Sequence, residues 1–309
     1  MAEETRNAYG KKLAELIVKD PKIVVFDADL TKSTKTAEAK KACPERHFNA
    51  GIAEANMLGM AAGMAASGKT AFASSFAIFA AGRAFEIIRN SICYPNLNVK
   101  VCATHAGLAV GEDGASHQAI EDVALMRALP NMKVFVPCDQ YETAAVIEYV
   151  SKIDGPCYVR MGRGKVDDVF TPETTFDFTK VNVLKKGSKV VLFAMGLMVQ
   201  EALKAAETLK EDGIDATVVN VSCLKPLDEE GVLSLLKEHE YAFTLEEHNV
   251  IGGLYSAVAE VKAKTDVTTK VTPIGVNDTF GESGKMKDVL KKYGMTAEHV
   301  VDVVRETLK

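Results

Sequence analysis

Short apolar runs alternate with longer segments over most of the chain. Three of these runs are IVVF at 23–26, VKVCAT at 99–104 and KVFVP from residue 133. Runs of this length, rich in β-branched residues, are typical of strands buried in a parallel sheet, and the segments between them are long enough for helices. The alternation therefore predicts an α/β fold in which helices cover the sheet.

The alternation is interrupted once, between residues 167 and about 188. Proline, threonines and charged residues replace the apolar runs there, and VVLFAMG at 190–196 begins a second series. We therefore predict a first domain at 1–170, a linker at 171–188 and a second domain at 189–309. A chain of 309 residues is long enough for two domains with separate cores. The expected architecture is two three-layer α/β/α domains, the second being smaller.

Composition and charge exclude several classes of protein. Hydrophobic residues make up 47% of the chain and charged residues 26%, which is typical of a folded protein. The net charge is −5 without a basic stripe, which argues against nucleic acid as a partner. No apolar run approaches the roughly 20 residues of a membrane-spanning helix, and no signal-peptide pattern is present, so we expect a cytoplasmic protein that does not bind membranes.

The six cysteines include no CxxC pair and mostly fall in apolar stretches. We expect them to be reduced and buried. They are Cys43, Cys93, Cys102, Cys138, Cys157 and Cys223.

Glu54 is the single charged residue between Gly51 and Gly68. It lies in the first turn of a predicted helix that follows a short strand-like segment at 47–50. A carboxylate at this place can serve the helix alone, because the positive end of the helix dipole favours a negative charge by about 0.3–1 kcal/mol. In such an uncharged segment it can also be a buried acid with a chemical role. These neighbouring residues leave both interpretations open.

A glycine-rich loop follows the strand predicted at 99–104. It contains two histidines and two acids within thirteen residues, and its glycines let the backbone turn tightly. Such a loop after a strand is where α/β proteins place binding and catalytic residues. The segment matches neither a GxGxxG motif nor a P-loop, and its spacing is not that of a zinc site, so no metal ligands are predicted. Its titratable residues are His105, Glu112, Asp113 and His117.

Polar residues also follow the strand predicted at 23–26, in the segment DADLTKSTKT. Two acids and several hydroxyls at a strand end are the pattern of a functional loop. For Ser33, Thr34 and Thr36 taken singly, we favour a solvated turn that caps the next helix.

Three phenylalanines lie near the junction of a predicted strand and helix in KTAFASSFAIFAAG. Aromatic residues at such a junction are usually core residues, but a ring face can also stack on a planar heterocycle. The three are Phe72, Phe76 and Phe79.

Three cations end the strand that begins at Cys157. Arg160, Arg163 and Lys165 lie beside glycines, an arrangement that suits an anionic group. An arginine fork matches phosphate oxygens bidentately, although exposed arginines are more often merely solvated.

The second domain carries few candidate residues for chemistry. Glu246, Glu247 and His248 form its one cluster, which we interpret mainly as a surface or interface feature. Two helices are predicted at the end of the chain, with caps at Ser283 and Thr296.

Several separated motifs together resemble the thiamine-diphosphate-dependent transketolases. They are TR at Arg6, DLTKS at 29–33, GIAE ending at Glu54, the FxxF run at 76–79, THAGLAVGEDGASHQ at 104–118, GRG around Arg163 and FGESG at 280–284. The resemblance covers nearly the whole chain but only half of a usual transketolase. The GDG motif and downstream asparagine that hold magnesium and the diphosphate in that family do not occur in this sequence.

The sequence is thus similar to the C-terminal, or beta, subunit of a split transketolase. The resemblance implies a transketolase-like pyrimidine-binding domain at 1–170 and a transketolase C-terminal-type domain at 189–309. It also implies a separate N-terminal, or alpha, subunit that holds the diphosphate and Mg²⁺ or Ca²⁺. An alpha2beta2 assembly with contacts between beta subunits is expected.

The resemblance also implies roles for residues near the cofactor. Glu54 matches the acid that bonds to the pyrimidine ring nitrogen and activates the aminopyrimidine. Phe76 would stack on that ring, with Phe79 beside it. His117 would lie near the cofactor's amino group and the reacting oxygen, and Asp29 near the thiazolium and the substrate.

For the substrate, the resemblance implies a sugar phosphate. Arg6, Ser33, His105 and Arg163 would surround the phosphate, and Asp113 would contact a hydroxyl. The reaction implied is transfer of a two-carbon ketol unit from a ketose phosphate to an aldose phosphate, as in the pentose phosphate pathway of carbohydrate metabolism.

Three alternatives stay open at this point. Deoxyxylulose-phosphate synthases share GIAE and a similar loop but typically have an arginine in place of His105. Beta subunits of 2-oxo acid dehydrogenases share GIAE and the two-chain arrangement but lack the 104–118 loop. A non-catalytic regulatory partner of a thiamine enzyme is the third, although the intact acids and histidines argue against it.

Overall fold

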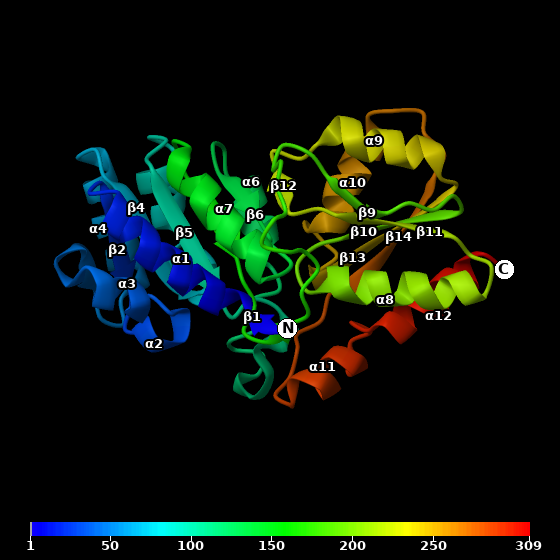
Figure 1. Cartoon of the computed structure of the whole chain (residues 1–309), viewed down its shortest axis with the longest axis horizontal. Coiled ribbons are helices and arrows are strands. Elements are labelled where there is room, and N and C mark those ends of the chain that lie inside the picture. The colour runs from blue at the N-terminus through cyan, green and yellow to red at the C-terminus, as the bar shows by residue number, and fades with distance from the viewer. Residues whose placement is uncertain (1) are drawn as a thin grey trace.

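The computed structural model describes residues 2–309 and contains two α/β units side by side (Figure 1). The first is built on a seven-stranded sheet with the order β12-β6-β7-β5-β4-β2-β3. Its strands run parallel except for β12 at one edge. The strands are β2 (Ile23–Asp27), β3 (His47–Asn49), β4 (Thr70–Phe76), β5 (Val99–Thr104), β6 (Lys133–Phe135), β7 (Cys157–Arg160) and β12 (Cys223–Lys225).

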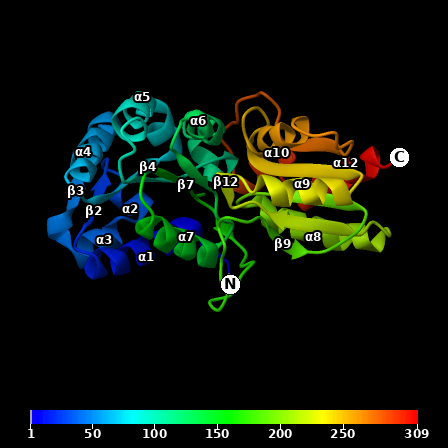
Figure 2. The same ribbon diagram turned by 90° about the horizontal axis from the view of Figure 1, so that it is seen from above.

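Helices cover both faces of this sheet (Figure 2). On one face, α4 (Glu54–Ala66), α6 (Asp122–Ala128) and the helical stretch made of η2 (Ile78–Arg83), α5 (Phe85–Ile87) and η3 (Ile88–Cys93) enclose a core that includes Phe26 and Val101. The other face is covered by α1 (Thr5–Lys19), α3 (Ala37–Ala42) and α7 (Gln140–Lys152), around Tyr9 and Phe72. Short elements at the ends of this unit are α2 (Thr31–Thr34), η1 (Pro44–Arg46), η4 (Leu108–Asp113) and the antiparallel pair of β1 (Glu3–Glu4) and β8 (Lys165–Val166).

The second unit is built on a five-stranded sheet with the order β14-β13-β10-β11-β9. It is parallel except for the antiparallel edge strand β9. Its strands are β9 (Asn182–Lys185), β10 (Val190–Ala194), β11 (Ala216–Asn220), β13 (Tyr241–Asn249) and β14 (Lys270–Val276). Its helices are α8 (Met198–Glu211), α9 (Glu229–Glu238), α10 (Leu254–Ala263), α11 (Met286–Lys292) and α12 (Ala297–Thr307). The predicted α/β fold is confirmed.

Two strands lie where the sequence did not place them. β9 falls inside the range predicted as linker and pairs with β11 of the second sheet. β12 comes from the second half of the chain but pairs with β6 of the first sheet. One continuous core also includes apolar residues from both halves, such as Phe26 and Phe193.

One of the two predicted helix caps is corrected and the other is confirmed. Ser283 does not cap α11, since its hydroxyl donates to the carbonyl of Glu112 at 2.6 Å. Thr296 does cap α12, by accepting from His299 N.

The cluster at 246–248 is buried, so of the predicted surface or interface feature the surface is excluded. Glu246 and His248 are 0% exposed and Glu247 is 4% exposed. The six cysteines are free and buried, as expected. Within residues 2–309, no helix is both long and apolar enough to cross a membrane.

Candidate active site

The predicted site residues lie around the carboxyl ends of parallel strands in the first sheet. Phe76 ends β4, His105 follows β5 and Arg163 follows β7, whereas Glu54 begins the helix after β3. Because these strands are parallel, their carboxyl ends share one edge of the sheet. The fold brings distant segments together there: Arg6 Nη1 lies 3.3 Å from His105 Nε2.

Glu54 is a buried acid rather than a helix cap. It is the first residue of α4, is 1% exposed, and makes no side-chain hydrogen bond to the first amides of that helix. Its Oε1 accepts from Ser75 Oγ at 3.2 Å, and its Oε2 accepts from Arg83 Nη1 at 2.8 Å. Ser75 lies near the carboxyl end of β4, so the carboxylate is held at the same edge of the sheet as the other predicted site residues.

Arg83 is a site residue that the sequence reasoning missed. It ends the π-helical segment η2, and its side chain is 52% exposed although its partner Glu54 is buried. Its guanidinium carbon lies 4.8 Å from the centre of the Phe79 ring, within the range of a cation–π contact. In the sequence, Arg83 could have been noticed as a cation four residues after Phe79, on the same helical stretch.

The aromatic rings form a connected group. Phe76 stacks on His105 with ring centres 3.8 Å apart and on Phe79 at 5.9 Å. His117 approaches Phe79 edge-on at 5.3 Å. Phe72 does not join this group, because its ring lies four residues before Phe76 on β4 and is buried in the core around Tyr9.

His105 is held in one orientation by two neighbours. Its Nδ1 lies 2.9 Å from Thr104 Oγ1, and its Nε2 faces Arg6 Nη1. Because a guanidinium can only donate, Nε2 is assigned as the acceptor and Nδ1 as the donor. Burial, together with the positive charges of Arg6 and Arg163, lowers the pKa of His105 to about 3, with smaller effects of His117 and Lys35. The imidazole is therefore neutral.

This neutrality predicts the titration behaviour of His105. A lowered pKa means that the uncharged form is retained as the pH falls from 8 to 5. We expect the ¹⁵N chemical shifts of the His105 ring to stay at values of the neutral Nδ1–H tautomer across that range, measured by NMR on histidine-labelled protein and assigned with the His105→Asn variant. A titration midpoint of the His105 ring near pH 6.5, the ordinary pKa of about 6.5 for histidine, would contradict this assignment.

Cations converge on the same place. Arg6 Nη1 donates to the carbonyl of Ser33 at 3.0 Å, so the contact with Ser33 is through the backbone. Arg163 Nη1 donates to the carbonyl of Val110. Lys35 was not predicted from sequence, yet it acts electrostatically on the same imidazole as the two arginines.

Two predicted acids lie at the periphery of this group. Asp113 is 3.7 Å from Arg163 Nη1, which also lies 3.7 Å from Glu112. Asp29 is exposed, and its bonds are to Asn49, whose Oδ1 accepts from Asp29 N at 3.0 Å. The structure does not bring Asp29 into contact with the aromatic group.

Asp27, rather than Asp29, organises the loop after β2. It is 0% exposed, and its Oδ2 accepts from the hydroxyls of Thr34 and Thr36 at 2.8 Å each. Its Oδ1 accepts from Leu30 N at 2.6 Å. The expectation of solvated hydroxyls is therefore wrong for Thr34 and Thr36, because a buried carboxylate needs such donors.

Comparison with known families decides the relationship of this chain. The transketolase pyrimidine-binding domain matches residues 2–168, and the transketolase C-terminal domain matches residues 179–300. This chain belongs to the transketolase family.

Other members of the transketolase family match the chain over almost its full length. A transketolase C-terminal section from Methanocaldococcus jannaschii is 50% identical over 306 residues, which cover 98% of this chain and 96% of the relative. A subunit of 6-deoxy-6-sulfo-D-fructose transketolase from Clostridium sp. strain MSTE9 is 38% identical over 301 residues, which cover 97% and 93%. The solved structure of a split-gene transketolase, an inactive beta4 tetramer, is 54% identical with a TM-score of 0.91. The match covers 98% of this chain and 97% of the chain in that structure. The resemblance to a split transketolase beta subunit is confirmed.

Thiamine diphosphate dependence is implied by membership of the transketolase family, and the donor set of this chain fits part of that cofactor. Arg83 connects the buried Glu54 carboxylate to the stacked rings of Phe76 and Phe79, and this combination suits an aminopyrimidine, which needs one hydrogen-bonding partner and an apolar face. Among residues 2–309, no group of three or more His, Cys, Asp or Glu side chains is arranged to hold a metal ion.

Proposed function

We propose that this chain is the catalytic C-terminal subunit of a two-chain transketolase, which transfers a two-carbon ketol unit from a ketose phosphate to an aldose phosphate. The observation that carries the proposal is the pairing of a buried acid, Glu54, with positively charged side chains near His105 on the same strand edge. The first suits the cofactor and the second suits the phosphate of a sugar.

Glu54 would hold the pyrimidine of thiamine diphosphate. The cofactor supplies the carbon nucleophile and electron sink that cleavage next to a ketone requires. A glutamate beside a pyrimidine ring nitrogen shares its proton with that nitrogen, and water is kept away because the carboxylate is 1% exposed. Ser75 and Arg83 fix the two carboxylate oxygens, so the acid is positioned before the cofactor binds. Phe76 and Phe79 offer apolar ring surface beside it.

The phosphate of the sugar would bind between Arg6, Arg163 and Lys35. Arg6 Nη1 lies 3.3 Å from His105 Nε2, and the charges of Arg163 and Lys35 also act on this neutral imidazole. An arginine fork matches phosphate oxygens, and two forks with one ammonium offset the charge of a phosphate dianion. His105 and Thr104 supply hydrogen-bonding groups without adding charge.

A second chain would supply the diphosphate and metal site. The similar split-gene transketolase forms a beta4 tetramer that is inactive, and the similar archaeal protein is named as a C-terminal section. Both descriptions agree with an alpha subunit that completes the site, and we expect an alpha2beta2 assembly with beta–beta contacts.

A sulfosugar is the second candidate substrate. The similar Clostridium protein is a subunit of a transketolase for 6-deoxy-6-sulfo-D-fructose. A sulfonate is also an oxyanion, so the same cations could bind it, but it carries one negative charge where a phosphate dianion carries two. Three cations around His105 favour the phosphate.

Reconstitution tests the proposal. The chain is purified alone and with its candidate alpha chain, and each sample receives thiamine diphosphate, magnesium, xylulose 5-phosphate and ribose 5-phosphate. Formation of sedoheptulose 7-phosphate by the pair and not by either chain alone is expected. A pair that binds the cofactor but turns over neither this couple nor 6-deoxy-6-sulfo-D-fructose would refute it.

Arg163→Ala is expected to raise the KM for phosphorylated donors about tenfold, because it removes one of the cations that would bind the phosphate. For an unphosphorylated ketose the change should be less than about twofold. Arg305→Ala is the matched control, since Arg305 pairs with Asp212 on the surface of the second domain. An equal rise in KM for phosphorylated and unphosphorylated donors would count against contact between Arg163 and the phosphate.

A further inference from the structure

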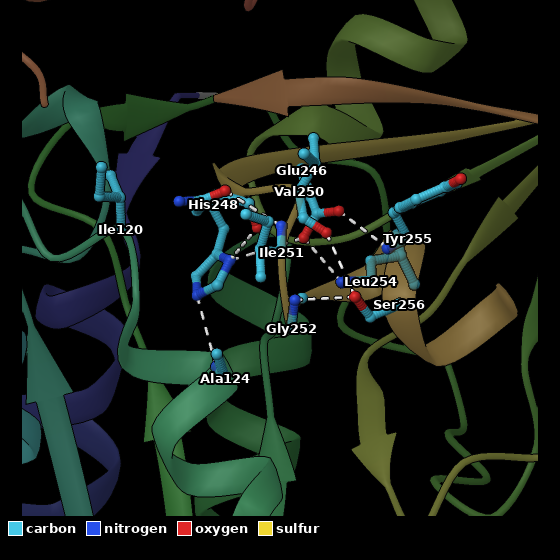
Figure 3. A network of polar contacts seen from close by, with 12 residues as sticks. Ile120, Ala124, Glu246, His248, Val250, Ile251, Gly252, Leu254, Tyr255 and Ser256 are labelled. Carbon is cyan, nitrogen blue, oxygen red and sulfur yellow. Dashed lines mark hydrogen bonds and ion pairs between the residues drawn. The ribbon is translucent and has the colours of Figure 1, made fainter. Parts of the chain in front are cut away.

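The second domain reaches the candidate site through β13, whose last residues are a buried charged cluster. Side chains alternate along a strand, so Glu246 and His248 point away from Glu247. Figure 3 shows Glu246 at the start of α10, where its carboxylate accepts from the amides of Leu254 and Tyr255, at 2.7 and 2.8 Å. It also shows His248 toward Ala124 of α6.

Glu247 faces the loop of the first domain that carries the site residues. Its Oε1 accepts a hydrogen bond from Ala109 N, and the amide of Leu108 also acts on this carboxylate. A Cβ on Gly107 would lie 2.4 Å from the Glu247 carboxyl carbon, so the loop touches the carboxylate directly. The contact falls shortly after His105, at the start of the η4 turn that ends at Asp113.

Glu247 is itself fixed by the first domain. Arg160 Nη2 donates to the backbone carbonyl of Glu247 at 2.9 Å and to that of Ala119 at 3.2 Å. Arg160 Nε also pairs with Asp122 at 2.9 Å, and Tyr158 donates to the same carboxylate at 2.7 Å. Because these groups are buried, the end of β13 has little freedom to shift relative to the first sheet.

A second contact from the second domain holds the far end of the loop. The segment at 280–284 lies against it: Ser283 Oγ donates to the carbonyl of Glu112, and Gln118 Nε2 donates to the carbonyl of Glu282 at 3.0 Å. The loop is thus attached to the second domain at 108–109 and again at 112 and 118. Between these attachments Val110 accepts from Arg163.

From this geometry we infer that Glu247 is a positioning residue for the active site, through which the second domain holds the 105–118 loop in its binding conformation. The role in turnover rests on the proposed function, but the structural role does not. Loss of the acceptor leaves two buried amides unpaired, and the loop can then satisfy them only by moving toward water. Such movement displaces Asp113 and Arg163 from the substrate.

The test is amide hydrogen exchange on the full chain alone, without sugar, cofactor or alpha subunit. Glu247→Gln is expected to speed exchange at Leu108 and Ala109 at least about tenfold, because an NH2 group, which cannot accept a hydrogen bond, replaces one of the two acceptor oxygens beneath these amides. Glu247→Asp keeps the carboxyl group on a side chain that is one methylene shorter. Its exchange rate at Leu108 and Ala109 should lie between those of wild type and Glu247→Gln. This variant also provides the test if Glu247→Gln fails to fold.

Glu246→Gln is the matched control. Both acids are buried, and burial raises the pKa of each to about 7, so the two glutamine variants remove a similar desolvation penalty. Glu246→Gln should change exchange at Leu254 and Tyr255 and leave 108–109 unchanged. Unchanged exchange at 108–109 in Glu247→Gln, or an equal rise there in Glu246→Gln, would overturn the inference.

Kinetics of the reconstituted pair give a second readout. Glu247→Gln should raise the KM for the phosphorylated donor about tenfold with kcat within about threefold, because a mobile loop must be ordered on binding. Glu246→Gln should change neither by more than about twofold. A fall in kcat alone would contradict the positioning role. Absence of turnover in the wild-type pair would instead refute the proposed function, and the exchange result would still decide the inference.

Discussion

Glu54→Gln is expected to abolish proton exchange at the thiazolium carbon of bound thiamine diphosphate and to lower turnover of the reconstituted pair by about a hundredfold to ten-thousandfold. Glutamine has the shape of glutamate, but its amide cannot transfer a proton to a pyrimidine nitrogen. Folding should be almost unaffected, because Arg83, which loses its ion pair, is half exposed and can be hydrated. Exchange is followed by NMR of quenched cofactor samples.

Glu142→Gln provides the control for removing a buried acid elsewhere. Glu142 is 1% exposed, and it accepts from Cys138 N and Asn220 Nδ2 at 2.7 Å each, away from the aromatic group. This variant should exchange the cofactor proton at the wild-type rate. Were Glu54→Gln also to exchange normally, the assignment of Glu54 to the pyrimidine would be refuted.

Gly107→Ala should destabilise the chain by about 2–6 kcal/mol. Gly107 has φ 78° and ψ −166°, a region that is essentially restricted to glycine and costs other residues about 1–3 kcal/mol. The added methyl would also lie 2.4 Å from the buried Glu247 carboxyl carbon, and overpacking of this kind costs about 1–3 kcal/mol more. The free energy of unfolding is measured in urea.

Gly114→Ala separates these two effects. Gly114 has almost the same backbone conformation, φ 75° and ψ −168°, but its Cβ would approach Ser283 only to 3.2 Å. The two variants share the backbone strain, so their difference of about 1–3 kcal/mol reports the clash with Glu247. Equal losses of stability would show that the loop moves away from β13 without resistance.

Much of the fold was predictable because its strands are locally encoded. β2, β5 and β10 are apolar runs between turns, and such runs indicate buried strands whatever their neighbours. β12 has three residues and is a strand only because it pairs with β6, a contact that no local pattern indicates. The same holds for β9, which lies among charged residues and gains its order from β11.

The candidate site also contains some residues that local sequence predicts and others that it does not. Glu54 and His105 could be identified because each belongs to a motif with its own local signature. Arg83 could not, since its role depends on a contact with a residue 29 positions earlier. The burial of Glu247 was not predicted for another reason. Adjacent charged residues usually indicate exposure to solvent, whereas the carboxylate of Glu247 is hydrogen-bonded by a backbone amide of the first domain.

β12 has a consequence for how the chain is made. During synthesis the first sheet lacks its edge strand until residue 225 has left the ribosome, so β6 is exposed as an open edge while the second domain is being translated. The N-terminal half thus completes its own sheet only with a piece of the later half. A polypeptide truncated near residue 170 would retain that open edge, and self-association through β6 is its expected fate.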